Sequence, residues 1–230
     1  MPKEEIRNQL LRRLPAADRT LLGPFERVDL KLRQSLEVAD AAVEFIYFVE
    51  LGFASVVADA SSKDPIEIGL IGHEGMTGSA IILGDTRSPF DTFVQGEGAA
   101  LRMPLVRFRA ALADRPALQA FFLLYVRSFL TQVASTAASN GRASVAQRLG
   151  RWLLMVQDRL GTTFPITHEF LSIMLAVRRP GVTLALQSLE ASGLIRATRG
   201  NVEIVDRTAL IASTKGAYGV AEREYRRLFP

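Results

Sequence analysis

The 230-residue chain contains no cysteine and only two histidines. Without cysteine it can form no disulfide, no thiolate zinc site and no cysteine-ligated iron–sulfur cluster. The N-terminal segment MPKEEIRNQLLRRL is too polar for a secretion signal. No apolar run reaches the roughly 18 residues that a membrane span needs. These absences predict a soluble cytoplasmic protein that has no membrane partner.

The scarcity of histidine also limits the kinds of enzyme that the chain could be. A cupin-like metal enzyme needs several imidazoles and a carboxylate around one metal, and haem needs an axial ligand. The only candidates are His73 and His168, which lie far apart in the sequence. A serine hydrolase would need a G-x-S-x-G turn, and the chain has none. We therefore expect no enzyme, no metal and no certain cofactor, while an unknown small-molecule effector stays open.

Charge is unevenly distributed along the chain. Residues 1–140 carry 15 Lys and Arg against 17 Asp and Glu, a net charge of −2. Residues 141–230 carry 13 against 7, a net charge of +6. A basic C-terminal third suggests a polyanionic partner such as nucleic acid. A solvated basic surface would show the same balance, so charge alone leaves both interpretations open.

The N-terminal half has a sequence pattern typical of a β-domain. From Glu4 to Leu22 the apolar spacing is near 3.6 and is broken by Pro15, which predicts short helices. Short apolar runs follow between Phe25 and Pro104, and several alternate with period two. These runs are VDLKL, EFIYFV, FASVVA, IEIGLI, FDTFVQ and AALRMP, with ASSKDP expected as a hairpin loop. The pattern predicts an antiparallel sandwich or barrel.

A continuous apolar stripe predicts one long helix after the strands. From Leu118 the apolar residues recur with alternating spacings of 3 and 1, and Asn140-Gly141 is expected to end the helix. Such a stripe needs a partner along its length, either the chain's own domain or a second copy. We favour the second copy. The residues expected in the dimer interface are Phe122, Tyr125, Phe129 and Val133.

The C-terminal third contains the elements of a winged helix-turn-helix. A helix is expected from about Ala143 to Leu160, and Thr167 can cap a second helix. Pro180 suits the first turn of a third helix, where its missing N–H costs nothing. The segment LIRATRGNVEIV is expected to form a two-stranded hairpin. Helix, short turn, helix and hairpin together favour DNA binding, in agreement with the charge.

Two arginines, Arg178 and Arg179, lie where the third helix begins. In a helix-turn-helix this helix enters the major groove N-terminus first. An arginine there can contact guanine O6 and N7, or a phosphate. Gly181 keeps side-chain bulk away from the backbone, and Thr183 could also reach base edges. Phosphate contacts alone remain an alternative for both arginines.

Over nearly its whole length the chain resembles the Crp/Fnr family of bacterial transcription regulators. The resemblance rests on a cyclic-nucleotide-binding-like β-roll (YFVELGFASV, IEIGLIGHEGMTG, RSPF), the long helix and the segment ITHEFLSIMLAVRRPGVTLALQSLEASGLI. It implies an α+β fold with a β-roll effector-binding-like domain in residues 1–116, a dimerisation helix and hinge in 117–140 and a winged helix-turn-helix in 141–230. It also implies a homodimer that binds double-stranded DNA at a palindromic operator and recruits or blocks RNA polymerase.

The resemblance also assigns residues to DNA. It places Thr167 and His168 near phosphates and makes Arg179 the main base-reading residue. The family often has a glutamate directly after that arginine and another arginine four residues later, but Pro180 and Thr183-Leu184 stand there in this chain. The operator is therefore not inherited from other members. The DNA-binding residues expected are Thr167, His168, Arg178, Arg179, Gly181, Thr183 and Arg199.

The effector is less determined by the resemblance. Members that bind cyclic AMP hold its phosphate with a Gly-Glu turn, a short helix and an Arg-Ser pair. Here Arg87 follows Glu74 by 13 residues, which is longer than we expect for such a phosphate-binding segment. Pro89 also removes a backbone donor, so cyclic AMP is not favoured. A cyclic-nucleotide-gated regulator and a protein-binding winged-helix module remain alternatives. The candidate effector-binding residues are Glu74, Gly75, Met76, Arg87 and Ser88.

Overall fold

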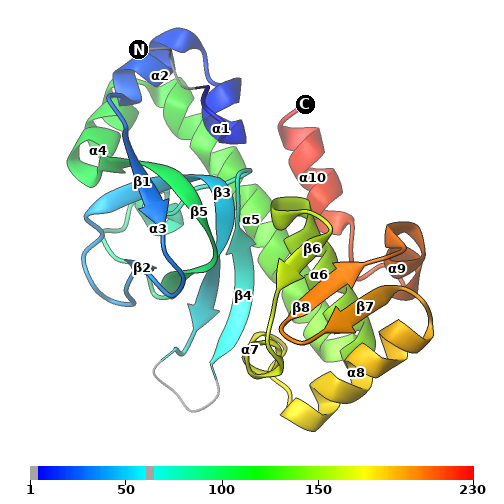
Figure 1. Cartoon of the computed structure of the whole chain (residues 1–230). Coiled ribbons are helices and arrows are strands. Elements are labelled where there is room, and N and C mark those ends of the chain that lie inside the picture. Colours follow the sequence, from blue (N-terminus) through cyan, green and yellow to red (C-terminus); the bar gives the residue numbers. More distant parts are fainter. Residues whose placement is uncertain (1–4, 61–64) are drawn as a thin grey trace. The chain divides into compact units, whose positions relative to one another are not determined.

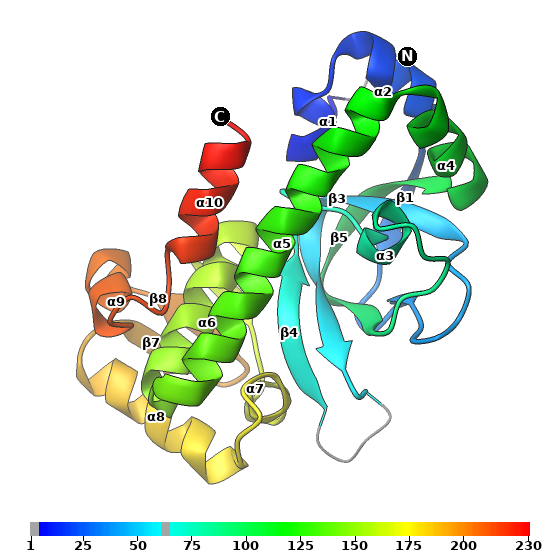
Figure 2. The same ribbon diagram turned by 180° about the vertical axis from the view of Figure 1, so that it is seen from behind.

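The computed structural model describes residues 5–60 and 65–230, which fall into two compact units (Figure 1). The first unit comprises the residues up to Val56, Leu70–Arg127 and Phe229, and the second holds Val57–Gly69, Ser128–Leu228 and Pro230. One continuous helix, α5 (Pro116–Arg142), contributes to both units (Figure 2). Most of the expected hairpin loop ASSKDP lies outside the described residues.

A five-stranded sheet forms the centre of the β-domain, as the alternating runs predicted. Strand β1 pairs with β5 in antiparallel register, with Glu26 opposite Arg102 and Leu30 opposite Gly98, and β2 also pairs with β5. The order across the sheet is β1-β5-β3-β4. The strands are β1 (Glu26–Leu30), β2 (Ser35–Glu37), β3 (Phe45–Ala58), β4 (Ile66–Ile71) and β5 (Asp91–Pro104). The predicted α+β class with an antiparallel sheet is confirmed.

The two longest strands each merge two runs that the sequence predicted as separate strands. EFIYFV and FASVVA are both part of β3, and FDTFVQ and AALRMP are both part of β5. A Cβ atom at Gly52 would lie 2.2 Å from the Gly96 carbonyl oxygen, and one at Gly98 would lie 2.1 Å from the Leu51 carbonyl oxygen. These glycines allow β3 and β5 to approach closely and do not end the strands.

Short helices cover the sheet of the first unit, and a buried asparagine fastens the first of them. Asn8 is fully buried, and its Nδ2 donates hydrogen bonds of 2.8 Å to the carbonyl oxygens of Val49 and Gly75. Its Oδ1 accepts from the Leu11 amide and so caps α1. The helices are α1 (Gln9–Arg13), α2 (Ala16–Leu22), α3 (Ser79–Ile82) and α4 (Leu105–Asp114). The predicted break at Pro15 separates α1 from α2.

The N-terminal half of α5 completes the core of the first unit. The Phe122 ring lies 5.2 Å from the Phe108 ring and 6.1 Å from the Phe48 ring, centroid to centroid. Tyr125 donates a hydrogen bond of 2.8 Å from its hydroxyl to the Met76 carbonyl oxygen. This face of the helix therefore packs on its own sheet.

The predicted end of α5 at Asn140-Gly141 is wrong. The helix passes through both residues and ends at Arg142. The next helix, α6 (Val145–Leu160), begins with a capping box in which the Ser144 hydroxyl accepts from the Gln147 amide and the Gln147 side chain accepts from the Ser144 amide. A start signal for α6, and not a stop signal for α5, therefore sets this boundary.

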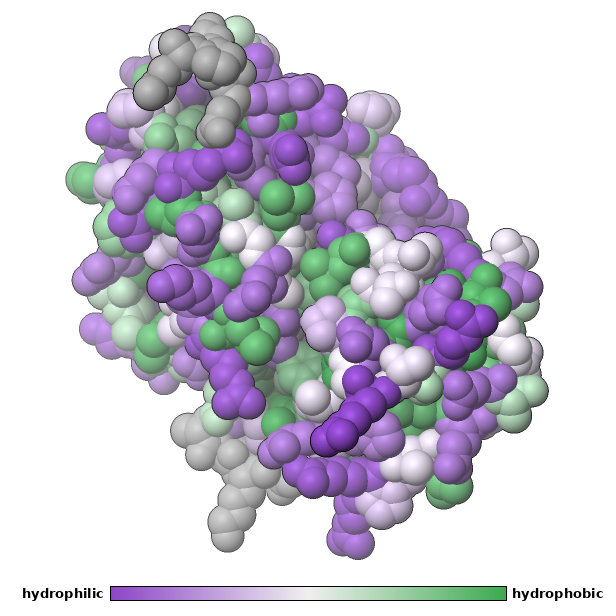
Figure 3. Space-filling view, viewed as in Figure 1, coloured by the Kyte–Doolittle hydropathy of each residue, from purple (hydrophilic) through white to green (hydrophobic). Residues whose placement is uncertain are grey.

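Among the described residues, α5 is the one helix long and apolar enough to cross a membrane by length and composition. A helix that packs in a protein core or between two chains has the same composition. Phe122 and Tyr125 are buried in the first unit, and Arg127 lies at the middle of the helix. Figure 3 shows hydrophilic side chains spread over one face of the molecule, with apolar ones between them in small groups.

The second unit contains the predicted winged helix-turn-helix. Its three-stranded sheet has the order β6-β8-β7, with Phe164 opposite Val202 and Ile195 opposite Ile204. Strand β6 extends the predicted hairpin by a third strand. The elements are α6, β6 (Thr163–Pro165), α7 (His168–Met174), α8 (Arg179–Ala191), β7 (Ile195–Thr198), β8 (Asn201–Ile204), α9 (Arg207–Ser213) and α10 (Val220–Leu228).

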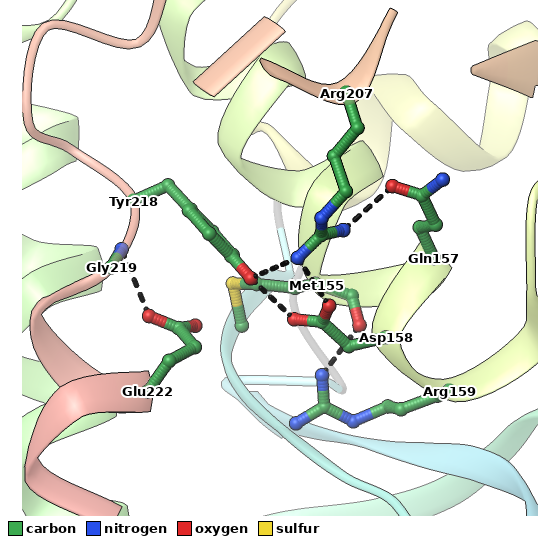
Figure 4. A network of polar contacts seen from close by, with 8 residues as sticks. All are labelled: Met155, Gln157, Asp158, Arg159, Arg207, Tyr218, Gly219 and Glu222. Atoms are coloured by element: carbon green, nitrogen blue, oxygen red, sulfur yellow. Dashed lines mark hydrogen bonds and ion pairs between the residues drawn. The ribbon is translucent and has the colours of Figure 1, made fainter. Parts of the chain in front are cut away.

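A polar network joins the C-terminal segment to α6 (Figure 4). Arg207 donates to the Gln157 side chain at 2.6 Å and to the Asp158 carboxylate at 2.7 Å. The Tyr218 hydroxyl donates to the other Asp158 oxygen at 2.7 Å, and burial together with this carboxylate raises the pKa of Tyr218. The network ties α9 and the start of α10 to the helix that supports the helix-turn-helix.

Candidate nucleic-acid interface

The turn between α7 and α8 is built by local signals. Thr167 caps α7 with its hydroxyl, which accepts from the Phe170 amide at 3.2 Å. Ala176 adopts a left-handed backbone conformation with φ of 47°, which redirects the chain. Arg178 is the N-cap residue of α8, and Pro180 lies in the first turn. The predicted role of Pro180 at the helix start is therefore confirmed.

Helix α8 has one buried face and one exposed face. Val182, Leu186 and Leu189 pack inward at helical spacing and are at most 4% exposed. The opposite face is open to solvent. The exposed residues of α8 and its N-cap are Arg178, Arg179, Pro180, Leu184, Gln187, Ser188, Glu190 and Ala191.

The structure brings three of the predicted DNA-binding residues into contact across the two helices. His168 Nδ1 lies 3.2 Å from the Thr183 hydroxyl oxygen, and that hydroxyl donates to the Arg179 carbonyl oxygen at 3.2 Å. When the Thr183 hydroxyl donates to the Arg179 carbonyl oxygen, its lone pairs are left to accept from the Nδ1–H tautomer of His168. The start of α7 and the start of α8 thus form one polar surface.

Glu169 is a member of this surface that sequence reasoning did not assign to the site. Its carboxylate lies 3.1 Å from an Arg179 guanidinium nitrogen, with the two side chains 69% and 63% exposed. A pair this exposed contributes little stability. It does restrict where the guanidinium points. The sequence offered only the acidic residue in the first turn of α7, and the turn geometry makes the pair.

Two further predicted residues lie apart from this cluster. Arg199 is exposed at the turn between β7 and β8, beside Gly200, whose φ is 80°. Gly181 lies in the first turn of α8, where an added Cβ would have Val177 at 4.0 Å as its nearest neighbour. The fold therefore leaves room for a side chain at position 181, and intrachain packing does not explain the glycine.

The predicted effector residues lie in the first unit, in separate local arrangements. Glu74 accepts a hydrogen bond from the Gly72 amide at 3.2 Å, and Met76 is fully buried. A Cβ at Gly75 would lie 2.7 Å from the Tyr125 hydroxyl oxygen. Ser88 is 7% exposed and donates to the Phe90 carbonyl oxygen, whereas Arg87 is exposed. The described residues contain no group of three or more acidic or histidine side chains that could hold a metal ion.

A buried carboxylate from another strand lies beside this segment. Glu37 is 8% exposed, and its two oxygens accept from the Gly78 amide at 3.0 Å and from the Thr92 hydroxyl at 2.8 Å. Burial raises the pKa of Glu37, although the two hydrogen bonds act in the opposite direction. Gly78 is the N-cap residue of α3. Sequence reasoning missed this contact because Glu37 and Gly78 meet only in the folded sheet.

Two of the four predicted interface residues belong to the core of the first unit. Phe122 is fully buried and Tyr125 is 4% exposed, so neither side chain is available to a second chain. This corrects their placement in the dimer interface. Phe129 and Val133 are half-buried.

The exposed side of α5 has its own regular pattern. We call it the outer α5 stripe. Its residues are separated by alternating steps of four and three, which is the heptad spacing of helices that pack in pairs. Leu130 within it is 63% exposed. The outer α5 stripe consists of Leu123, Arg127, Leu130, Ala134 and Ala137.

A sequence comparison matches part of the second unit. The family model of the Crp-like helix-turn-helix domain matches residues 147–213, from within α6 to the end of α9. No curated protein sequence matches the chain significantly.

Solved structures extend the similarity to most of the chain at low sequence identity. A protein described as a Crp/Fnr-family transcriptional regulator from Eubacterium rectale is 17% identical, with a TM-score of 0.70 over 92% of this chain and 100% of that chain. FixK2 from Bradyrhizobium japonicum is 13% identical, with a TM-score of 0.69 over 83% and 97% of the two chains. The c-di-GMP-responsive global regulator CLP of Xanthomonas campestris is 16% identical, with a TM-score of 0.67 over 84% and 100%. The predicted resemblance is thus confirmed for the fold and for the helix-turn-helix domain.

Proposed function

We propose that this chain, which has the fold of the Crp/Fnr regulators and a Crp-like helix-turn-helix domain, is a homodimeric transcription regulator that reads a palindromic operator. The observation that carries the proposal is the joint surface of α7 and α8, where Arg179 is exposed and held by Glu169. The basic charge of residues 141–230 supports the same conclusion, because DNA is a polyanion.

The roles proposed for the residues follow from their places on this surface. Arg179, at the start of the recognition helix α8, contacts a guanine edge in the major groove. Arg178 and His168 contact phosphates, as do the Thr167 hydroxyl and the wing residue Arg199. Gly181 lies in the first turn of α8 and Thr183 one turn after Arg179, where the backbone can approach the bases closely. In this arrangement phosphate contacts position the protein and Arg179 supplies specificity.

Dimerisation through the outer α5 stripe would match a palindromic operator. A two-fold protein axis presents two equal recognition helices to two equal half-sites. The small side chains Ala134 and Ala137 permit close approach of the two helices. The domain roles that we propose are a β-roll in residues 1–116, a dimerisation helix in 117–140 and a DNA-binding domain in 141–230. RNA polymerase is the further partner proposed, in the cytoplasm, and no enzymatic activity is proposed.

The proposed regulator is not gated by cyclic AMP. An anion held at the start of α3 would have to displace the buried Glu37 carboxylate, which already accepts from the Gly78 amide. Two like charges at this place would repel one another. An unknown effector elsewhere in the β-roll stays part of the proposal. The alternative, a cyclic-nucleotide-gated regulator, requires the Glu37 contact to open.

DNA binding measured by fluorescence anisotropy tests the proposal. The probe is a palindromic site selected from random DNA, with and without cyclic AMP and cyclic GMP. We expect tight binding that neither nucleotide changes and that weakens steeply as salt rises, because several phosphates are neutralised. A flat salt response would instead favour the protein-binding winged-helix module. Binding that appears only with a nucleotide would establish the gated alternative.

The substitution Arg179→Ala tests the base-reading role. We expect it to weaken binding to the selected site by about 1–3 kcal/mol and to relax specificity at one base. Arg226→Ala is the matched control, because Arg226 is an exposed arginine on α10 outside the helix-turn-helix. An equal loss on random DNA would show that Arg179 contacts only phosphate.

A further inference from the structure

Leu184 is a large apolar side chain on the outward face of α8, and it is 68% exposed. Each helical residue turns by about 100°, so Leu184 points almost directly away from the buried side of α8 marked by Val182, Leu186 and Leu189. Pro180 and Gln187 lie one turn before and after it and are exposed too. Leu184 is thus the most prominent apolar group on the face that we propose for DNA.

A single exposed leucine is ordinary on a protein surface. The neighbours of Leu184 make its position informative. From Pro180 to Leu189, α8 has no charged side chain. Thr183, the hydroxyl nearest to it in sequence, already bonds with His168 and with the Arg179 carbonyl oxygen. Apart from Arg179, the face of α8 that we propose for DNA therefore presents an aliphatic side chain and no charged hydrogen-bond donor.

The major groove contains one apolar group that such a side chain can recognise. Thymine carries a C5-methyl group there, and no other base does. Contact between this methyl and an aliphatic side chain removes apolar surface of both from water. Leu184 follows Arg179 by five residues, a rise of about 7.5 Å along α8 and a turn of about 140°. With the long Arg179 side chain reaching the groove from the helix start, Leu184 would face a base pair within a few steps of the arginine contact.

We propose that Leu184 is a specificity-determining residue that reads a thymine methyl group in each half-site. The inference rests on the proposed DNA-binding function and adds a base preference to it. It predicts an operator in which the arginine contact is accompanied by a thymine that is discriminated by its methyl group alone.

Deoxyuridine substitution in the selected operator tests this directly. Replacing one thymine by deoxyuridine in both half-sites removes only the methyl group and keeps base pairing. For the wild-type protein we expect one thymine position at which the replacement weakens binding about fourfold per half-site, the value for one buried methyl group. For Leu184→Ala we expect weaker binding to the thymine operator and no further loss at that position.

The readout is a ratio of affinities within each protein, so a partly inactive variant preparation does not change it. Val205→Ala is the matched control, since Val205 is a 53% exposed apolar residue after β8, and it should keep the full methyl effect. Equal deoxyuridine penalties in the wild type and in Leu184→Ala would overturn the inference, as would a wild type insensitive to every thymine methyl. Both results leave the DNA-binding function intact if Arg179→Ala still relaxes specificity. Failure to select any operator would remove the proposed function and this inference with it.

Discussion

Two polar sites, one in each unit, differ in how deeply they are buried. In the first unit Asn8, Glu37 and Tyr125 are buried, and their hydrogen bonds join strands and helices of the same unit. In the second unit Arg179 and Glu169 are exposed and pair with one another at the surface. Buried polar groups stabilise a fold because losing one partner leaves the other unsatisfied. Exposed ones contribute little stability and stay available to a ligand.

This difference separates the expected effects of substitution. Changes to the buried residues Asn8 and Glu37 should alter the free energy of unfolding, and changes on the surface of α7 and α8 should alter DNA affinity. The outer α5 stripe extends over both units. Substitutions in it should alter both dimer assembly and DNA affinity.

The largest effect is expected for Leu130→Asp. Aspartate at this position removes the large exposed apolar side chain at the centre of the outer α5 stripe and places a carboxylate where the two copies would pack, so we expect a monomer in sedimentation. Affinity for the palindromic site should fall about a hundredfold or more, because the two half-sites are then bound independently. The matched control is Val106→Asp, at a 77% exposed position of α4. An unchanged dimer mass for Leu130→Asp would place the interface elsewhere.

A smaller effect, on stability alone, is expected for Asn8→Ala. The substitution removes the Asn8 donor from the Val49 and Gly75 carbonyl groups and removes the cap of α1. We expect the free energy of unfolding to fall by about 2–3 kcal/mol in urea titrations. Thr20→Ala, at an exposed helical position, should change it by less than about 0.5 kcal/mol. If Asn8→Ala lowered the free energy of unfolding no more than Thr20→Ala, the buried Asn8 would not stabilise the first unit more than an exposed polar residue does.

The smallest effect is a pH dependence at Glu37. Because burial raises the pKa of Glu37 in the folded chain, its contribution to stability is fully present below the ordinary carboxyl value of 4.5 and is lost as pH rises through the raised pKa. Glu37→Gln does not titrate. The wild type should therefore lose stability relative to this variant as pH rises from 4.5 toward neutrality.

Urea unfolding of both proteins over that pH range measures the difference. Glu44→Gln, at an exposed position in the same unit, should run parallel to the wild type. Parallel curves for Glu37→Gln would show that the Glu37 carboxyl is not perturbed by its surroundings.

The winged helix-turn-helix was the part best predicted from sequence. Thr167 as a cap and Pro180 in a first turn act through their own backbone or within one turn. Cap and proline signals of this kind act within one turn of the chain. Glycine signals were misleading, because Asn140-Gly141 lies within α5, and Gly52 and Gly98 allow a close approach of β3 and β5 that no local pattern shows.

The face of α5 illustrates the same limit. Its apolar residues are so numerous that both sides of the helix look suitable for a partner. The sheet of the first unit takes the side with Phe122 and Tyr125, and the outer α5 stripe is left exposed. Periodicity finds an apolar helix, but the neighbouring elements decide which side is covered.

The sequence by itself determined the α+β class, the winged helix-turn-helix and the arginines at the start of α8, since caps, prolines and hydrophobic periods act over a few residues. Only the tertiary structure decided that Glu169 holds Arg179, that Glu37 accepts from Gly78 and that Phe122 faces inward. Each of these contacts joins elements that separate segments of the chain bring together. Their partners are chosen by packing and by the need to satisfy buried polar groups, and neither appears in a local pattern.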